Sequence, residues 1–188
     1  MRKTLLLSLA LLFITTVHAQ FSIKPAPSPA FSENLSKITR AFRNNYYAVQ
    51  GDKLSSQDDM DVYSSAVVLP GAQHCVIYRF HSKTDTTASW QGIMYAGDNY
   101  KQALKIYKDN CKLVNRCKIN LEGSAAAVFT GKIDQPESDL RFVSSVFSLN
   151  TKDAAYDQFY AEVELVNLNF DQWEVRLNLQ NKKDDDEK

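Results

Sequence analysis

Three neighbouring segments of the chain have the composition of β-strands, and only short turns separate them. Residues 62–69 (VYSSAVVL), 73–81 (QHCVIYRFH) and 87–96 (TASWQGIMYA) are rich in β-branched and aromatic side chains. A Pro-Gly pair at 70–71 separates the first two, and the polar stretch 82–86 separates the second from the third. Because neither connection is long enough to hold a crossover helix, the pattern predicts a three-stranded antiparallel meander.

A segment on each side of this meander repeats apolar residues at helical spacing. The first predicts a helix over about 32–44 with Ser32 as its N-cap, and its apolar residues are Phe31, Leu35, Ile38 and Phe42. The second predicts a helix over about 99–113 with Asp98 as its N-cap, and its apolar arc contains Tyr100, Ala103, Leu104, Tyr107, Cys111 and Val114. Both helices are amphipathic, so we expect each of them to pack on a sheet.

Four more strand patterns follow the second helix, over about 124–132, 140–149, 156–167 and 172–180. In the last of them, apolar residues alternate with polar ones, as in a strand with one buried face; the apolar positions are Trp173, Val175, Leu177 and Leu179. The predicted order is therefore α-βββ-α-ββββ. It indicates the α+β class, with two helices packed on a mainly antiparallel sheet, in a single domain over residues 31–180.

The first twenty residues, MRKTLLLSLALLFITTVHAQ, have the layout of a cleaved secretory signal peptide. Two basic residues precede an apolar run over 5–17, and Val17 and Ala19 stand at positions −3 and −1 of a cut before Gln20. A membrane anchor is the alternative, but the run is shorter than the roughly 20 residues of a spanning helix, and no later segment predicts a transmembrane helix. We therefore expect residues 1–19 to be removed and the protein to be exported, either to a periplasm or out of the cell.

Both ends of the mature chain are predicted to lie outside the folded domain. Residues 20–30 (QFSIKPAPSPA) carry three prolines at alternating positions, which favours an extended, polyproline-like spacer. Residues 181–188 (NKKDDDEK) contain no apolar side chain and predict a charged, disordered tail.

Three cysteines remain after export into an oxidising compartment, so a disulfide is expected. Cys111 and Cys117 are close in sequence across a predicted helix-to-strand turn, which favours a Cys111–Cys117 bridge. Cys75 with Cys111 is the alternative pairing, and the absence of any bridge is a third. A cysteine left over at position 75, within an apolar run, is expected to be buried and inert.

Charge and motif content exclude several classes of function. The chain has 22 Lys+Arg and 22 Asp+Glu, without the basic excess of a nucleic-acid-binding protein, so no nucleic-acid partner is expected. Metalloprotease, serine-hydrolase, P-loop and dinucleotide-binding motifs are all missing, and no cofactor is expected. His81 lies about 20 Å along an extended strand from Cys75, and His74 points to the opposite face, so no local metal site is predicted.

Two acidic clusters occur in predicted loops: Asp58, Asp59 and Asp61, and further along Asp134, Glu137 and Asp139. Solvated loop charge is the plain interpretation of both, and calcium binding is the alternative.

A row of lysines on the predicted second helix is the most specific surface pattern, at Lys101, Lys105, Lys108 and Lys112. The plain interpretation is the solvated face of an amphipathic helix. The sharper hypothesis is a binding face that docks on an anionic envelope surface, a polysaccharide or a protein partner.

Taken together, these patterns predict an exported, non-catalytic binding domain for a protein, a glycan or a small apolar ligand held in a pocket under the helix. One alternative is a small hydrolase or isomerase in which His74, His81 or a loop aspartate acts as the base. The other alternative is a structural or assembly subunit of the cell envelope, which would expose an apolar patch or an edge strand.

Overall fold

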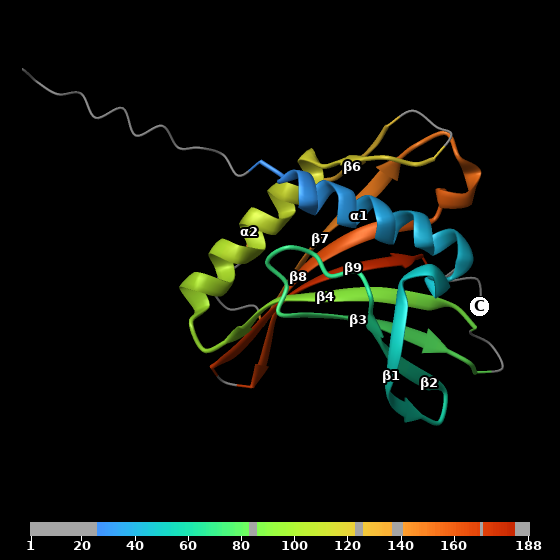
Figure 1. Cartoon of the computed structure of the whole chain (residues 1–188). Helices are drawn as coiled ribbons and strands as arrows, with labels where there is room; N and C mark the ends of the chain where they lie inside the picture. Colours follow the sequence, from blue (N-terminus) through green and yellow to red (C-terminus); the bar gives the residue numbers. More distant parts are fainter. Residues whose placement is uncertain (1–25, 83–85, 123–125, 137–140, 170, 183–188) are drawn as a thin grey trace, which may run out of the picture.

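The computed structural model describes residues 26–82, 86–122, 126–136, 141–169 and 171–182 (Figure 1). In this part of the chain, two α-helices and nine strands form a mixed α+β fold in which the sheet predominates. The α+β class and the antiparallel sheet are thus confirmed. The predicted signal peptide and all but the start of the predicted charged tail lie outside the described residues.

The chain divides into two halves, each a helix followed by strands. The first half contains α1 (Pro29–Ala41), β1 (Gln50–Gln57), β2 (Met60–Ser65), β3 (His74–Phe80) and β4 (Ala88–Gly97). The second half contains α2 (Tyr100–Arg116), β5 (Lys118–Ile119), β6 (Ala127–Thr130), β7 (Phe142–Asn150), β8 (Phe159–Asn169) and β9 (Gln172–Asn181). Three short 3₁₀ turns, η1 (Phe42–Asn44), η2 (Tyr47–Val49) and η3 (Ala154–Tyr156), join some of these elements.

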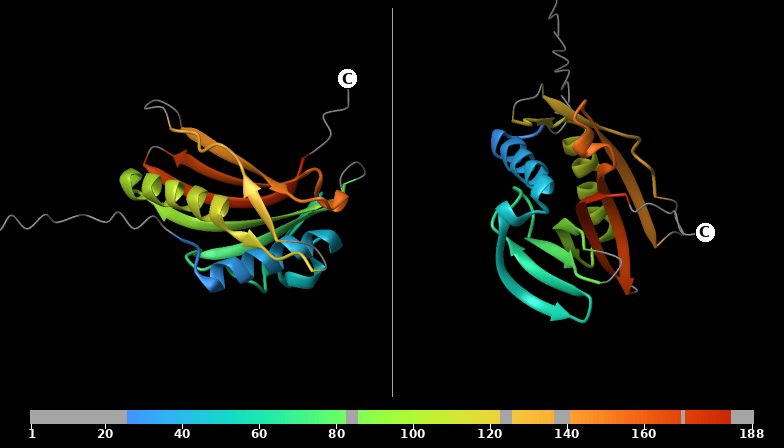
Figure 2. Two further views of the ribbon diagram at one scale, coloured as in Figure 1. Left: turned by 90° about the horizontal axis from the view of Figure 1, so that it is seen from above. Right: turned by 90° about the vertical axis from the view of Figure 1, so that its right-hand side faces the viewer.

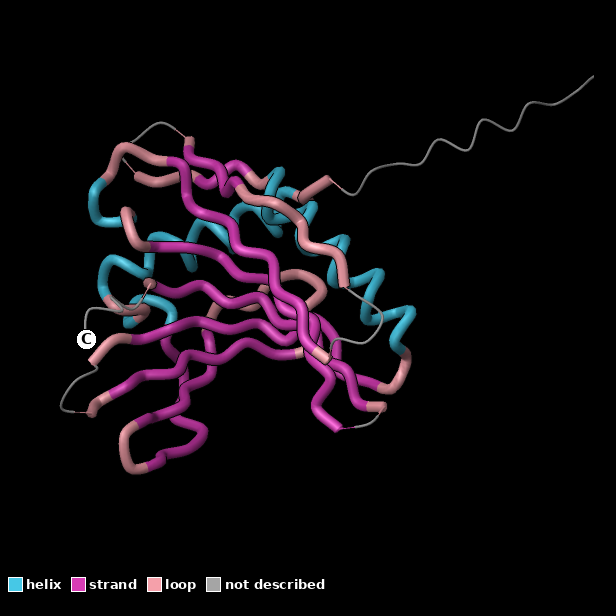
Figure 3. Tube along the Cα trace, turned by 180° about the vertical axis from the view of Figure 1, so that it is seen from behind, coloured by secondary structure: helices cyan, strands magenta, loops and turns pink. Residues whose placement is uncertain are grey.

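The nine strands form one antiparallel sheet in the order β1-β2-β3-β4-β9-β8-β7-β6-β5. The two meanders therefore meet at their last strands, where β4 pairs with β9 in the middle of the sheet. Helix α2 carries the chain from β4 at this centre to β5 at the far edge. Both helices lie on the same face of the curved sheet (Figure 2), and the view from behind shows the other face in front of them (Figure 3).

The hydrophobic core lies between the helices and the sheet. On β8 and β9 the predicted alternation is confirmed, because every second residue is buried on the face toward the helices: Phe159, Ala161, Val163 and Leu165 on β8, and Val175, Leu177 and Leu179 on β9. The buried arc of α2 packs against these strands and contains Ala103, Tyr107, Cys111 and Val114. Burial of these apolar surfaces is the main source of the stability of the domain.

The predicted strand order was incomplete, because β1 and β5 were not recognised and the sheet has nine strands rather than seven. The sequence of β1, QGDKLSSQ, contains one large apolar residue, Leu54, and that side chain is 59% exposed. An edge strand exposed along most of its length needs no apolar face, so it carries no alternating signal. Strand β5 has only two residues, too few for any pattern.

Helix α1 begins three residues earlier than predicted, and its N-cap is Ser28 rather than Ser32. The Ser28 hydroxyl accepts a hydrogen bond from Phe31 N (3.1 Å). Pro29 takes the first helical position, where its fixed φ fits and its missing N–H is not needed. The last two residues of the predicted proline-rich spacer are therefore helical.

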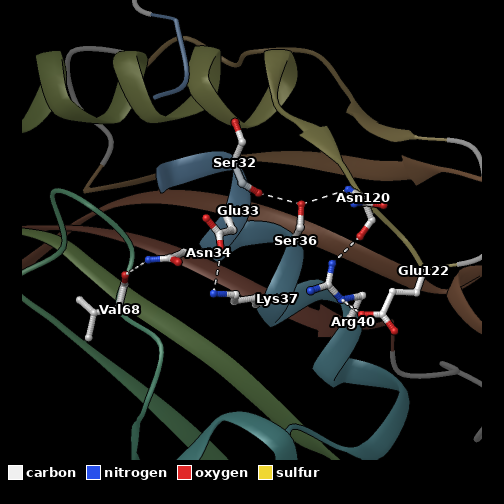
Figure 4. Close-up of polar contacts among 9 residues, drawn as sticks. All are labelled: Ser32, Glu33, Asn34, Ser36, Lys37, Arg40, Val68, Asn120 and Glu122. Atoms are coloured by element: carbon white, nitrogen blue, oxygen red, sulfur yellow. Dashed lines mark hydrogen bonds and ion pairs between the residues drawn. The ribbon is translucent and has the colours of Figure 1, made fainter. Parts of the chain in front are cut away.

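Polar contacts on both sides of α1 connect it to the two halves of the sheet (Figure 4). On one side, Asn34 Nδ2 donates to Val68 O (2.8 Å) in the loop that follows β2. On the other side, Asn120 N donates to Ser36 Oγ (3.0 Å), and Arg40 Nη1 donates to Asn120 O (2.7 Å). Helix α1 therefore bridges the loop after β2 and the segment after β5, which lie far apart along the sheet order.

The prediction of a disulfide is wrong, because Cys75, Cys111 and Cys117 are all buried free thiols. Helix α2 continues to Arg116 instead of ending near residue 113, so Cys111 and Cys117 are separated by nearly two helical turns. Six helical residues rise about 9 Å, whereas the Cα atoms of a disulfide lie about 4.4–6.8 Å apart. Burial raises the pKa of the Cys111 thiol to about 11, which makes it unreactive at neutral pH.

Among the described helices, neither combines enough length with enough apolar character to cross a lipid bilayer.

Candidate functional site

An open depression of about 550 Å³ lies at the end of the sheet where β1, β2 and β3 come together. Residues from three regions line it: the turn before β1, the paired strands, and the segment between β3 and β4. They are Asn45, Tyr47, Lys53, Ser56, Asp61, Arg79, Phe80, His81 and Thr86. About half of these side chains are charged or titratable, so a ligand in the depression would meet charged groups as well as carbon surface.

A pair of left-handed residues in the turn before β1 brings Tyr47 to the rim of the depression. Asn45 and Tyr46 have φ values of 55° and 62°, a conformation that is unusual for a bulky residue such as tyrosine. The reversal sends Tyr46 into the core, where its hydroxyl donates to Leu179 O (2.7 Å), and leaves Tyr47 61% exposed. Core packing of one tyrosine thus positions its neighbour at the surface.

Arg79 forms the inner wall of the depression and is only 8% exposed. Its guanidinium donates from Nε and Nη2 to Gln50 Oε1 (3.1 and 2.7 Å) and from Nη2 to Asn45 O (2.9 Å). The group also stacks on the ring of Tyr47, 3.8 Å from the ring centroid. These contacts fix the plane of the guanidinium.

The charge of Arg79 is not neutralised by a protein carboxylate in the described part of the chain. Asp61 is directly opposite Arg79 in the β2–β3 register, yet no oxygen of Asp61 comes within 4 Å of the guanidinium. The hydrogen bonds that Arg79 makes within the described residues go to neutral oxygens of Gln50 and Asn45. A buried cation held only by neutral acceptors is unusual, because burying a charge without an opposite charge is costly.

Asp61 instead binds groups from β1 and from the end of β3. Its Oδ1 accepts from Lys53 Nζ (2.8 Å) and from Ser56 Oγ (2.6 Å), and it lies 3.7 Å from His81 Nε2. Its Oδ2 accepts a longer bond from the Tyr63 hydroxyl (3.3 Å). The hydrogen bond from Lys53, followed by that from Ser56, lowers the pKa of Asp61 to about 2. Asp61 is therefore ionised at neutral pH and is a poor general base.

The close pairing of β1 with β2 is needed for this geometry. A side chain at Gly51 would collide with Ser64 on the neighbouring strand, so glycine permits the approach. Breaks in the β1–β2 register on either side of Lys53 alter the twist of β1 there. Lys53 is thereby placed next to Asp61, and the cations Lys53 and Arg79 share the depression with one carboxylate.

The lysine row predicted as a binding face lies on α2, away from this depression. Lys101 and Lys105 are exposed, and Lys108 and Lys112 are half-buried. Asp109 makes ion pairs with Lys105 (2.8 Å) and Lys112 (3.5 Å). Lys101 and Lys108 have no carboxylate within 4 Å among the described residues. The row is thus partly neutralised on its own helix.

The other predicted candidates are dispersed. His74 and His81 are at opposite ends of β3, and only His81 joins the depression. Of the first acidic cluster only Asp61 does so, whereas Asp58 and Asp59 are exposed in the β1–β2 turn. Asp134 forms an ion pair with Lys132 (3.5 Å), and the rest of its cluster, Glu137 and Asp139, lies outside the described residues. No group of three metal-ligating side chains occurs in the described part of the chain.

Of the nine residues that line the depression, only Asp61 and His81 were candidates in the sequence; Tyr47, Lys53 and Arg79 are the most important of those that were not. Only Arg79 leaves a signal, because it has the same strand parity as Cys75 and Ile77 and so places a charge on the buried face of an apolar strand. Tyr47 and Lys53 look like ordinary surface residues. Their role depends on the turn at Asn45 and on the pairing of β1, neither of which the sequence pattern indicates.

Comparison of the chain with models of protein families, with curated proteins and with solved structures finds no match. Function must therefore be inferred from the geometry of this chain.

Proposed function

We propose that the protein is an exported, non-catalytic binding domain and that the depression at the end of β1, β2 and β3 holds a glycan. The observation that carries this proposal is the pairing of an exposed aromatic ring, Tyr47, with a buried and rigidly held cation, Arg79, in an open depression that charged side chains also line. A sugar ring has a face of C–H groups that packs on an aromatic ring, and it has hydroxyl groups that bind charged and polar side chains.

The depression fits the other candidate ligands and functions less well. A small apolar ligand would leave Lys53 and Asp61 without water and without new partners. Of the candidate bases that line the depression, Asp61 is unsuitable, because its lowered pKa keeps it ionised and weakly basic. An open surface with fixed donors is what recognition of a flexible, hydroxylated chain requires.

Export is part of the same proposal and rests on the N-terminal pattern, residues 1–19. Expression of the full chain with its N-terminus intact tests it directly. N-terminal sequencing of the protein recovered from outside the cytoplasm is expected to begin at Gln20. Recovery of the uncleaved chain in the cytoplasm would contradict export.

The binding proposal is tested by affinity electrophoresis of residues 20–188 in gels that contain soluble polysaccharide. Dextran, xylan and polygalacturonate are suitable probes because they differ in backbone and charge. We expect retardation in at least one gel and about a tenfold weaker effect for Tyr47→Ala, since the stacking platform is removed. Tyr100→Ala is the matched control, because Tyr100 is also a partly exposed tyrosine but packs on Trp173 at the other side of the molecule. Absence of retardation in all three gels, or equal loss in both variants, would refute glycan binding in the depression.

A further inference from the structure

Arg79 is a buried cation with no carboxylate partner among the residues that the structure describes, and it lines a depression that is open to ligands. Buried charges in proteins are normally paired, since the loss of hydration is otherwise not compensated. The Nε and Nη2 groups of Arg79 donate to Gln50 and Asn45, whereas Nη1 has no acceptor among the described residues and is the group available to a carboxylate. The arrangement is that of an anion site whose anion comes from the ligand.

Lys53 provides a second cation at the rim of the same depression. Its side chain is 46% exposed, and its ammonium group lies 2.8 Å from Asp61 Oδ1. The ring nitrogen Nε2 of His81, whose side chain is 45% exposed, lies near the same oxygen of Asp61. Among the described residues that line the depression, two permanent cations therefore face one permanent anion, which leaves a surplus of positive charge.

Resting on the proposed function, we infer that the glycan is acidic and that a uronate residue is the group recognised. The carboxylate of the uronate binds between Arg79 and Lys53, and the C–H face of a sugar ring packs on Tyr47. No covalent step is involved.

Asp61 has a specific part in this arrangement, because it is an anion that competes with the ligand. It occupies Lys53 in the free protein, and Lys53 must share its donors when a uronate binds. Removal of the Asp61 charge should therefore strengthen binding of an acidic sugar. Removal of the Lys53 charge should weaken it, both by losing a cation and by leaving Asp61 free to approach Arg79.

These opposite effects define the experiment, which is isothermal titration of residues 20–188 with tetragalacturonate at low and moderate salt. We expect Lys53→Gln to weaken binding about tenfold and Asp61→Asn to strengthen it about threefold or more. The wild-type affinity should fall as salt is added. Asp59→Asn is the matched control, since it removes one carboxylate from an exposed position in the same hairpin, and it should change the affinity by less than about twofold. Thermal unfolding of each variant verifies that it is folded.

Two further probes separate failure of this inference from failure of the proposed function. An uncharged tetrasaccharide of galactose that binds as tightly as tetragalacturonate would overturn the uronate inference and leave glycan binding intact. Tetraglutamate that binds as tightly as tetragalacturonate would overturn it in favour of an acidic peptide. Weaker binding of tetragalacturonate by Asp61→Asn than by the wild type would also overturn the uronate inference, because the aspartate would then be a ligand contact rather than a competitor. If neither saccharide binds, the proposed function is refuted together with the uronate inference.

Discussion

The two halves of the molecule are built alike, as a helix followed by an antiparallel meander, but they place charge differently. Over residues 159–165 and 173–179 of β8 and β9, the face toward the helices is apolar and the polar side chains point away from it. On β2 and β3 the same face of the sheet carries Asp61 and Arg79 as cross-strand partners. The second half therefore supplies most of the regular core. At the end of the first half, charged side chains take the positions on this face that apolar side chains occupy in the second half.

The junction between the halves shows how the sheet tolerates this difference. On the face away from the helices, a row of hydrogen bonds crosses four strands, from the Tyr78 hydroxyl to Gln91 (3.2 Å), from Gln91 to Asn178 (2.8 Å), and from Asn178 to Glu164 (2.8 Å). It runs across the β4–β9 pair that joins the meanders. Polar side chains here satisfy one another, whereas Arg79 in the depression has no carboxylate partner among the described residues.

The largest expected effect on stability comes from truncating a buried side chain in the core of the second half. Leu177 on β9 is fully buried, so Leu177→Ala should lower the free energy of unfolding by about 2–5 kcal/mol. Leu54 on β1 is 59% exposed, so Leu54→Ala should change it by less than about 0.5 kcal/mol. Chemical denaturation monitored by tryptophan fluorescence measures both. Equal losses for the two variants would break the contrast between the halves.

A smaller loss is expected at the junction itself. Asn178 is 7% exposed and takes part in two hydrogen bonds of 2.8 Å, so Asn178→Ala should cost about 1–2 kcal/mol. Gln57→Ala, at the exposed end of β1, is the control and should be nearly neutral. If Asn178→Ala were also neutral, the row of hydrogen bonds would not contribute to joining the halves.

The contribution of Asp61 to stability should depend on pH in a defined direction. Its pKa in the folded protein is about 2, below that of an aspartate in an unfolded chain, near 3.9. The stabilisation is therefore fully present above about pH 4 and is lost as the pH falls toward 2. In thermal unfolding between pH 6 and pH 2, the difference in Tm between the wild type and Asp61→Asn should shrink over that window. A difference that stays constant would show that the ion pair with Lys53 does not form.

The smallest expected effect has the opposite sign and concerns a carboxylate of the second half. Burial is the main reason that the pKa of Glu162 on β8 is raised, and the charge of Glu164 adds to it. The ionised form is disfavoured in the folded protein, so stability should rise as the pH falls from the raised pKa toward the ordinary value. Glu162→Gln should therefore raise Tm at pH 7 by about 1–2 °C, and the gain should disappear in acid. A lower Tm for Glu162→Gln at pH 7 would contradict this picture.

The regular part of the fold could be predicted because its signals are local. The alternation of β9 and the apolar arc of α2 each lie within one segment, and burial follows directly from them. Strand β1 could not be predicted, because an exposed edge strand needs no apolar pattern. The disulfide prediction failed because it depended on where α2 ends, and helix ends are the least predictable part of a helix; α2 continues to Arg116.

The candidate site was largely invisible in the sequence, although one of its residues left a trace. Arg79 interrupts the buried face of an apolar strand, which marks it as unusual. The lysine row on α2 gave the stronger pattern, but lysines at helical spacing show only that this face of the helix is exposed to solvent. It does not show that the face is concave or that its charges are unpaired.

Local patterning in the chain was sufficient to determine the α+β class, the two amphipathic helices and the faces of the central strands, since neighbours in sequence set these features. Only the tertiary structure decided that Tyr47, Lys53 and Arg79 surround one depression and that Asp61 pairs with Lys53 instead of Arg79. The physical reason is that strand pairing, strand register and a left-handed turn set these distances. Each of them depends on residues that are far apart along the chain or on a backbone conformation that has no hydrophobic signature.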